Sequence, residues 1–344
     1  MNKDIESSTI AIAQECIENF PVLVLGSGSS AMFGIPGLHD LKQHLLTKMS
    51  PRSSSAGDKR DWCNFQMKLR CTDLESALDS VQLPEILTNY IVETTWDFLA
   101  GYDHKVFEKV IEDRNLIPLT RLFKFLFDST QKEIHVVTPN YDRVAEYAAD
   151  CGGLTHYTGF SYGHLRNQSQ RMITVPTGKS PLRVVNIWKV HGSLDWFKDE
   201  DGAIIGLPVS NVRPSYLMPV IVTPGIEKYR LTHEEPFLQI KREADNALRN
   251  ADSYLCVGYG FNDRHLQTTL RGRFNSKEVP MVVLTKQLSD NAKKFLLNSK
   301  SNRYLAIEEY GEGSCIYTYD FPDGSILPSR SIWRLDHFLE FVIS

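Results

Sequence analysis

The segment that follows residues 22–25 has the residue types of a phosphate-binding loop. The apolar run VLVL ends in a turn whose residues are Gly26, Ser27, Gly28, Ser29 and Ser30. Glycines lack a Cβ and let the backbone approach a ligand closely, while loop amides and serine hydroxyls can donate hydrogen bonds to a pyrophosphate. Ala31 stands where a full dinucleotide fingerprint has its third glycine. The loop is therefore typical of either a phosphate site or an ordinary strand-to-helix turn.

Three further polar residues follow strand-like runs later in the chain. Asn140 and Asp142 come after IHVVTP, and His191 comes after VVNIWKV. A histidine with a pKa near neutrality can take a proton from a reacting group. Each residue also has a structural alternative: Asn140 as a helix N-cap, Asp142 as an acid favoured in a first helical turn, and His191 as a turn residue bonded to backbone.

A fourth polar segment follows the apolar run YLCV at residues 254–257. Gly258, Tyr259 and Asn262 belong to this segment, and Asn262 or Asp263 can cap a helix that begins near Arg264. Gly258 and Asn262 could equally serve turn and cap geometry alone.

Strand-like and helix-like segments alternate along the chain, which predicts an α/β fold with a doubly wound, mostly parallel, Rossmann-like sheet. Strands are predicted at 22–25, 134–138, 184–190, 219–223, 254–257 and 281–285. The carboxyl ends of parallel strands meet at one edge of a sheet, so we expect the four polar segments to converge there. Two intervening stretches look peripheral: HYTGFSYG at 156–163 is too polar and glycine-rich for a core element, and 199–218 reads as a surface excursion.

A helical subdomain interrupts this pattern. Residues from about 40 to 130 have mostly helical periodicity, and we expect them to be inserted into the α/β framework. We divide the chain into a nucleotide-binding catalytic domain at 1–300 and a C-terminal extension at 301–344, which has two β-like runs and a final helix.

The composition is that of an ordinary globular protein, with 42% apolar and 23% charged residues. The net charge of -4 and the lack of a basic run argue against direct nucleic-acid binding. The amino terminus resembles neither a secretory signal nor a membrane anchor, and the six cysteines contain no C-x-x-C pair. We therefore expect a cytoplasmic protein with no membrane partner.

Together the polar segments resemble the sirtuin family, whose members bind NAD and cleave its bond between nicotinamide and ribose. The resemblance rests on GSGSSAMFGIP, TPNYD, HGS, PVIVTPG and ADSYLCVGYGFND, which span most of residues 20–290. It implies that the glycine loop holds the pyrophosphate and that Asn140 contacts the ribose and positions the attacking group. It further implies that Asp142 holds the nicotinamide carboxamide and that His191 is the general base. The expected adenine-side contacts are Gly258, Tyr259 and Asn262.

The sequence also departs from the sirtuin deacylases. Their zinc module has four cysteines after the His-Gly motif, but no cysteine lies between His191 and Cys256 here, so no zinc is predicted. The usual Gly-Ile-Pro-Asp-Phe-Arg segment reads GIPGLH at 34–39, and Pro139 replaces a glutamine. The NAD-cleaving set remains, whereas the peptide-binding side is lost. This pattern resembles the sirtuin-like NAD hydrolases of bacterial antiphage defence, in which water is the acceptor.

The resemblance implies an NAD+ glycohydrolase that releases nicotinamide and ADP-ribose, with Asn140 and His191 as catalytic residues. Its expected use is toxic depletion of NAD+ during phage infection. We expect a homo-oligomer in which the inserted helices and the tail restrain activity, through oligomer contacts or through a partner such as a HerA-type ATPase. Two alternatives stay open: an NAD-dependent protein deacylase, and a non-catalytic module that senses NAD or ADP-ribose. The sequence does not separate linear from cyclic ADP-ribose as the product.

Overall fold

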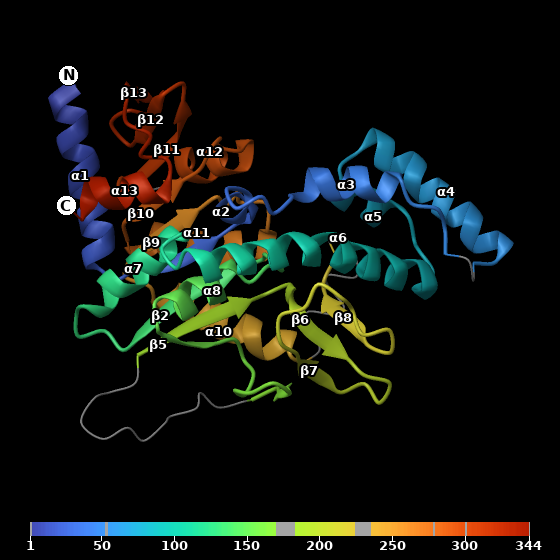
Figure 1. Cartoon of the computed structure of the whole chain (residues 1–344). Helices are drawn as coiled ribbons and strands as arrows, with labels where there is room; N and C mark the ends of the chain where they lie inside the picture. Colours follow the sequence, from blue (N-terminus) through green and yellow to red (C-terminus); the bar gives the residue numbers. More distant parts are fainter. Residues whose placement is uncertain are drawn as a thin grey trace.

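The main sheet is assembled around the first strand, whose neighbours come from distant parts of the chain (Figure 1). The computed structural model describes residues 2–51, 54–169, 183–223, 235–277, 279–299 and 301–343. Within these ranges the strands of the main sheet lie in the order β13 (Ser325–Leu327), β12 (Gly313–Thr318), β11 (Tyr304–Tyr310), β10 (Met281–Leu284), β9 (Tyr254–Val257), β1 (Val22–Leu25), β2 (Glu133–Thr138), β5 (Val184–Lys189) and β3 (Thr155–Tyr157).

Neighbouring strands from β11 to β3 all run parallel, and β12 and β13 extend the sheet antiparallel beyond β11. β1 pairs with β2 on one side and with β9 on the other. The chain extends the sheet from β1 first in one direction and later in the other, which creates a topological switch point at the carboxyl end of β1. The predicted doubly wound, mostly parallel α/β fold is confirmed.

Helices cover both faces of the sheet, because alternate residues of each buried strand point to opposite sides. Leu23 and Leu25 belong to one core cluster, and Val22 and Val24 belong to the other. The first cluster includes residues of α1 (Asn2–Glu18), α6 (Glu85–Glu112), α7 (Pro118–Phe127), α8 (Val144–Cys151) and α13 (Leu335–Val342). The second includes residues of α10 (Phe237–Asn250), α11 (Arg264–Lys277) and α12 (Asp290–Leu297).

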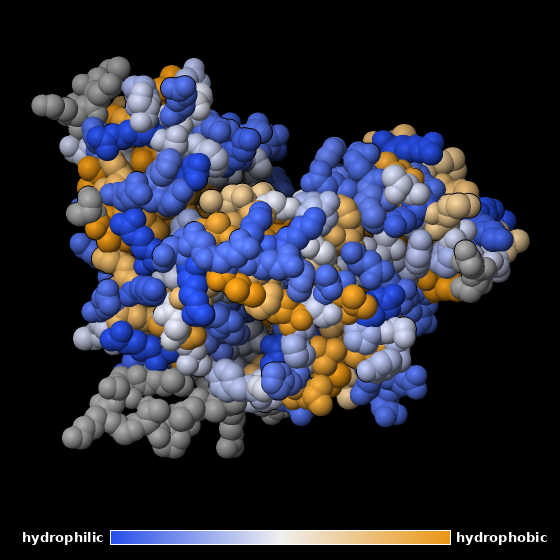
Figure 2. All heavy atoms as spheres, viewed as in Figure 1, coloured by the Kyte–Doolittle hydropathy of each residue, from blue (hydrophilic) through white to orange (hydrophobic). Residues whose placement is uncertain are grey.

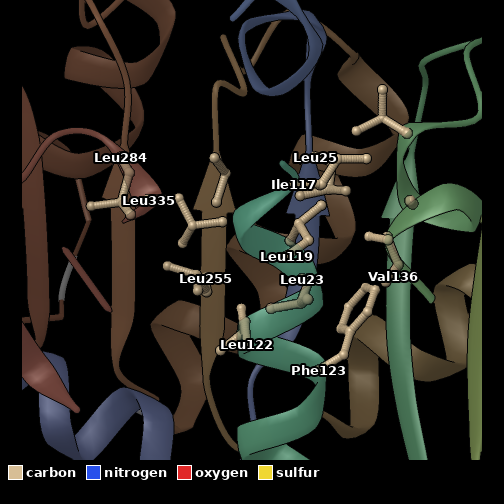
Figure 3. Packing of buried hydrophobic residues seen from close by; sticks show 14 of the residues in the cluster. Leu23, Leu25, Ile117, Leu119, Leu122, Phe123, Val136, Leu255, Leu284 and Leu335 are labelled. Carbon is tan, nitrogen blue, oxygen red and sulfur yellow. The ribbon is translucent and has the colours of Figure 1, made fainter. Parts of the chain in front are cut away.

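The helix α7 shows how this packing follows from the sequence. Its apolar residues recur at helical spacing, so Leu119, Leu122 and Phe123 lie on one side. Figure 3 shows these side chains beside Leu23 and Leu25 of β1. Burial of each such side chain contributes roughly 1.5–3 kcal/mol, which fixes α7 against the middle of the sheet.

The helices between β1 and β2 are α2 (Ser27–Ala31), α3 (Leu38–Leu46), α4 (Ala56–Cys71), α5 (Leu74–Ser80), α6 and α7. Some of them build a third, smaller core. A separate cluster joins α3, α4, α5 and the start of α6, with Trp62 and Phe65 at its centre. In Figure 2 these helices form the lobe on the right, and a notch at its upper edge lies between it and the neighbouring part of the molecule. No helix in the described ranges combines the length and apolarity needed to cross a membrane.

The predicted strand at 219–223 does not join the main sheet. It overlaps β8 (Met218–Ile221), which pairs antiparallel with β6 (Gly192–Lys198) in a second sheet of order β4 (Arg166–Asn167), β7 (Ile204–Gly206), β6 and β8. The expected surface excursion at 199–218 was wrong in part, because β7 and the buried Leu217 lie within it. Pairing with β6 supplies the backbone hydrogen bonds that bury this stretch.

The expectation for residues 156–163 was also wrong. β3 forms the edge of the main sheet, and Tyr157 and Phe160 are buried. The Tyr157 hydroxyl donates to the Ser169 carbonyl at 2.6 Å, and the Phe160 ring lies 4.9 Å from that of Trp196. Polar atoms in this segment are satisfied locally, so its rings can enter the core despite its polar composition.

Candidate active site

A cavity lies at the carboxyl ends of β1, β2, β5 and β9, beside the topological switch point. The predicted site residues that line it are Gly26, Ser27, Ser30, Asn140, Asp142, His191, Tyr259 and Asn262. The remaining predicted residues, Gly28, Ser29 and Gly258, lie behind this surface in the contact between two loops. The structure therefore brings all four polar segments to one place.

The predicted turn over Gly26–Ser30 was wrong in its length, because α2 already begins at Ser27 with Gly26 as its N-cap. The glycines allow the start of α2 and the loop after β9 to touch at their backbones. The Gly26 N–H donates to the Val257 carbonyl and the Gly28 N–H donates to the Gly258 carbonyl, each at 3.0 Å. Gly258 has a φ of +59°, and a Cβ there would lie 2.2 Å from the Ser29 nitrogen. A side chain at this position would collide with the backbone. The N–H groups of Gly26 and Gly28 are therefore used within the fold. The side chains of Ser27 and Ser30 line the cavity.

Asn140 is held by the glycine loop. Its Nδ2 donates to the Gly26 carbonyl at 2.9 Å and to Ser30 Oγ at 3.2 Å. The N-cap of α8 is Arg143, so Asn140 does not serve as that cap. No described residue donates a hydrogen bond to Oδ1 of Asn140, which leaves this acceptor for a ligand at the cavity.

Asp142 is a buried carboxyl group beside the same loop. Burial raises the pKa of Asp142 to about 6, although the nearby Lys189 ammonium and a hydrogen bond from Ser30 favour its ionised form. Lys189 is fully buried, donates to the main-chain carbonyl of Asp142 and lies 3.1 Å from Glu146. The pKa of Asp142 is therefore raised toward neutrality, and burial is the main cause.

His191 is positioned by a tight turn and by an acid. Gly192 has a φ of +90°, and the Val222 N–H donates to the His191 carbonyl at 2.8 Å. The imidazole Nε2 lies 2.9 Å from Oδ2 of Asp263, with the two side chains 14% and 6% exposed. A buried carboxylate of this kind orients the ring and stabilises its protonated form.

Asp263 is a residue that the sequence analysis considered only as a cap. Its Oδ1 accepts from the backbone N–H groups of His265 at 2.9 Å and Leu266 at 3.0 Å, so it does cap α11. Its second oxygen faces His191. In the sequence, Asp263 is only an acid directly before a predicted helix. Its partner His191 lies 72 positions away along the chain, so only the fold shows the pair.

The inserted helices contribute a wall of the cavity that no motif indicated. Leu41 of α3, Glu75 of α5 and Leu99 of α6 all line it. These three residues reach the site through helix packing, so their spacing in the sequence has no functional pattern. Tyr141, between Asn140 and Asp142, also lines the cavity and donates its hydroxyl to the Val222 carbonyl at 2.6 Å.

The loop after β9 supplies the remaining predicted contacts. Tyr259 is buried, and its hydroxyl has no hydrogen-bond partner among the described residues. Asn262 accepts from Nδ2 of Asn291 at 2.9 Å through its Oδ1. Within the described ranges, no group of three or more histidine, cysteine, aspartate or glutamate side chains could hold a metal ion. The motif residues Pro224 and Gly225 lie outside the described ranges.

Comparison with known proteins gives one match by sequence and several by structure. A family model described as SIR2-like domain matches residues 134–305. A structure described as a basis for the mechanism and regulation of Sir2 enzymes shares 13% identity, over 88% of this chain and 92% of that chain, with a TM-score of 0.43.

Two further solved structures are similar to the chain. A Sir2 homologue in complex with NAD shares 15% identity over 79% of each chain, with a TM-score of 0.42. A mutant Sir2 homologue in complex with ADP-ribose shares 13% identity, over 82% of this chain and 86% of that chain, with a TM-score of 0.44. No curated protein matches the sequence.

The two roles of Asp263 can be separated by substitution. Asparagine caps helices as well as aspartate, so Asp263→Asn keeps the cap and removes the negative charge that faces His191. Asp263→Ala removes both. We expect urea unfolding to show that the alanine variant is less stable than the asparagine variant by about 1 kcal/mol. Equal stability of the two variants would contradict the capping role.

The buried Asp142 makes stability depend on pH. Its folded pKa of about 6 exceeds the ordinary value of 3.8, so the folded state binds a proton more tightly between those values. Protonation of Asp142 therefore stabilises the folded state at low pH, and this contribution to the free energy of unfolding is lost as the pH rises through that window. Relative to wild type, Asp142→Asn should gain about 2 kcal/mol of unfolding free energy between pH 4 and pH 7.5. The exposed Asp201→Asn should gain none, and a gain equal to that of the Asp142 variant would refute the assignment.

Proposed function

The chain belongs to the SIR2-like domain family, which supports an NAD-utilising enzyme, and we propose that it hydrolyses NAD+ to nicotinamide and ADP-ribose. The observation that carries this proposal is the shared cavity of Asn140 and His191 at the switch point. One side chain offers an amide oxygen to which no described residue donates, and the other is an imidazole paired with a buried acid. Hydrolysis needs both a positioned water and a group to take its proton.

In this proposal NAD+ lies across the crevice with its nicotinamide ribose between Asn140 and His191. The bond between C1′ of the ribose and the pyridinium nitrogen breaks, and nicotinamide leaves as a neutral molecule with the bonding electron pair. A water oxygen bonds to C1′ and gives its proton to His191. Asp263 stabilises the imidazolium that forms.

The other predicted residues would hold the two ends of the substrate. Ser27 offers its hydroxyl group to the pyrophosphate, and Asp142 accepts from the carboxamide N–H of nicotinamide. Ser30 connects Asn140 with Asp142. Asn140 donates to the Ser30 hydroxyl, and this hydroxyl in turn donates to Asp142. Tyr259 and Asn262 would contact the adenine side. A substrate bound in this way would have its reacting carbon fixed between nucleophile and base.

We further propose that the activity depletes NAD+ during phage infection, as the resemblance to antiphage NAD hydrolases suggests. Such an enzyme must be restrained until infection. We propose a homo-oligomer in the cytoplasm and a partner such as a HerA-type ATPase as the sources of that restraint and its release. This part of the proposal is supported by analogy with related proteins, not by a contact in the fold.

Release of nicotinamide from NAD+ tests the enzymatic proposal. We expect Asn140→Ala and His191→Ala each to lower the rate at least about 100-fold, because one removes the group that positions water and the other removes the base. Matched controls are the exposed Asn115→Ala and His164→Ala, which should keep the wild-type rate.

Three results would lead to other conclusions. Equal release by wild type and both site variants would refute the site assignment. Deacetylation of an acetylated peptide that consumes NAD+ in equal amount would favour the deacylase. Binding of ADP-ribose with no turnover, even in the presence of the partner, would favour a sensing module.

Phage infection tests the biological proposal. Cells that express the wild-type chain with its partner should lose most of their NAD+ after infection, whereas cells with His191→Ala should keep it. NAD+ measured in cell extracts through the infection distinguishes the two. The same loss in both strains would show that this chain is not the cause.

A further inference from the structure

The inserted helices place a carboxylate in the cavity. Glu75 lies in the first turn of α5, whose start is fixed by Asp73: its Oδ1 accepts from the Ser76 N–H at 2.9 Å. Leu74 and Ala77 of the same helix pack into the core of the insertion. The half-buried Glu75 lines the cavity together with the apolar Leu41 and Leu99.

The charged side chains that line the cavity are mostly acidic. Three carboxylates, those of Glu75, Asp142 and Asp263, line it, and no lysine or arginine lines it within the described residues. Asp142 is opposed by the nearby Lys189, and Asp263 faces His191. Glu75 forms no ion pair or side-chain hydrogen bond with any described residue. Of the three carboxylates, Glu75 is therefore the one whose charge no described residue balances.

This charge fits the proposed cleavage. NAD+ has a positive pyridinium ring, and departure of neutral nicotinamide moves that positive charge onto the ribose, as in glycoside hydrolysis. A carboxylate in a partly apolar cavity stabilises such a charge more strongly than it would in water. After water has added, the ribose is neutral again, so the stabilisation is greatest in the transition state.

We propose that Glu75 is a catalytic residue supplied by the inserted helices, whose carboxylate stabilises the positive charge that develops on the nicotinamide ribose. This inference rests on the proposed NAD+ hydrolysis. It gives the insertion a direct part in the active site, in addition to any regulatory contacts.

The test compares Glu75→Gln, which keeps the size and hydrogen-bonding atoms of the side chain, with wild type. We expect kcat for nicotinamide release to fall about tenfold or more, while the dissociation constant for ADP-ribose changes by less than about twofold. Glu75→Asp should recover part of the lost rate. The matched control is Asp79→Asn, an exposed acid of the same helix, which should retain the wild-type kcat.

Each other outcome overturns the inference in a recognisable way. An active wild type with an equally active Glu75→Gln removes Glu75 from the mechanism and leaves the proposed function intact. Parallel losses of kcat and ADP-ribose affinity show a structural or general binding role. An inactive wild-type chain, with or without its partner, overturns the proposed function and this inference with it.

Discussion

The backbone contact between the loops after β1 and β9 is the constraint on which the site depends. Gly26 and Gly28 meet Gly258 so closely that no side chain fits at the interface. The carbonyl of Gly26 then accepts from Asn140, which ties the loop after β2 to the same point. Three strand ends are thus locked together at the switch point, and the cavity opens beside them. The glycines that look like phosphate ligands in the sequence also serve this packing.

A buried set of charges connects the inserted helices to this arrangement. Asp103 of α6 accepts from the guanidinium and the backbone N–H of Arg143, directly after Asp142, and from the Tyr147 hydroxyl. Removal of one partner from a buried pair costs about 3–5 kcal/mol, because the other charge is left unpaired. Trp96 adds a hydrogen bond from its indole to the Leu194 carbonyl at 2.7 Å. The helix α6 is therefore fixed to the segment after β2 that contains Asn140 and Asp142, and α5 packs in the same small core as the start of α6.

The second sheet fixes the position of the histidine without cysteine ligands. β6 begins at Gly192, and a Cβ there would lie 2.2 Å from the Val220 carbonyl of β8. The rings of Phe160 and Phe237 pack against Trp196 of β6 and stabilise this sheet. His191 thus lies at the tight turn between β5 of the main sheet and β6 of the second sheet. Its backbone has little freedom there, which favours a constant distance to Asp263.

Local patterns were sufficient for most of the main sheet and for the edge where the cavity lies. Apolar β-branched runs identified the parallel strands, and polar residues directly after them identified the edge where the site lies, because parallel strands share their carboxyl side. Burial of Phe160 and the transfer of residues 218–221 to a second sheet depended on partners far along the chain. The pairing of His191 with Asp263 and the arrival of Glu75 at the cavity depended on how helices pack. Such contacts depend on shape and burial in three dimensions, so the pattern of neighbouring residues in the chain does not predict them.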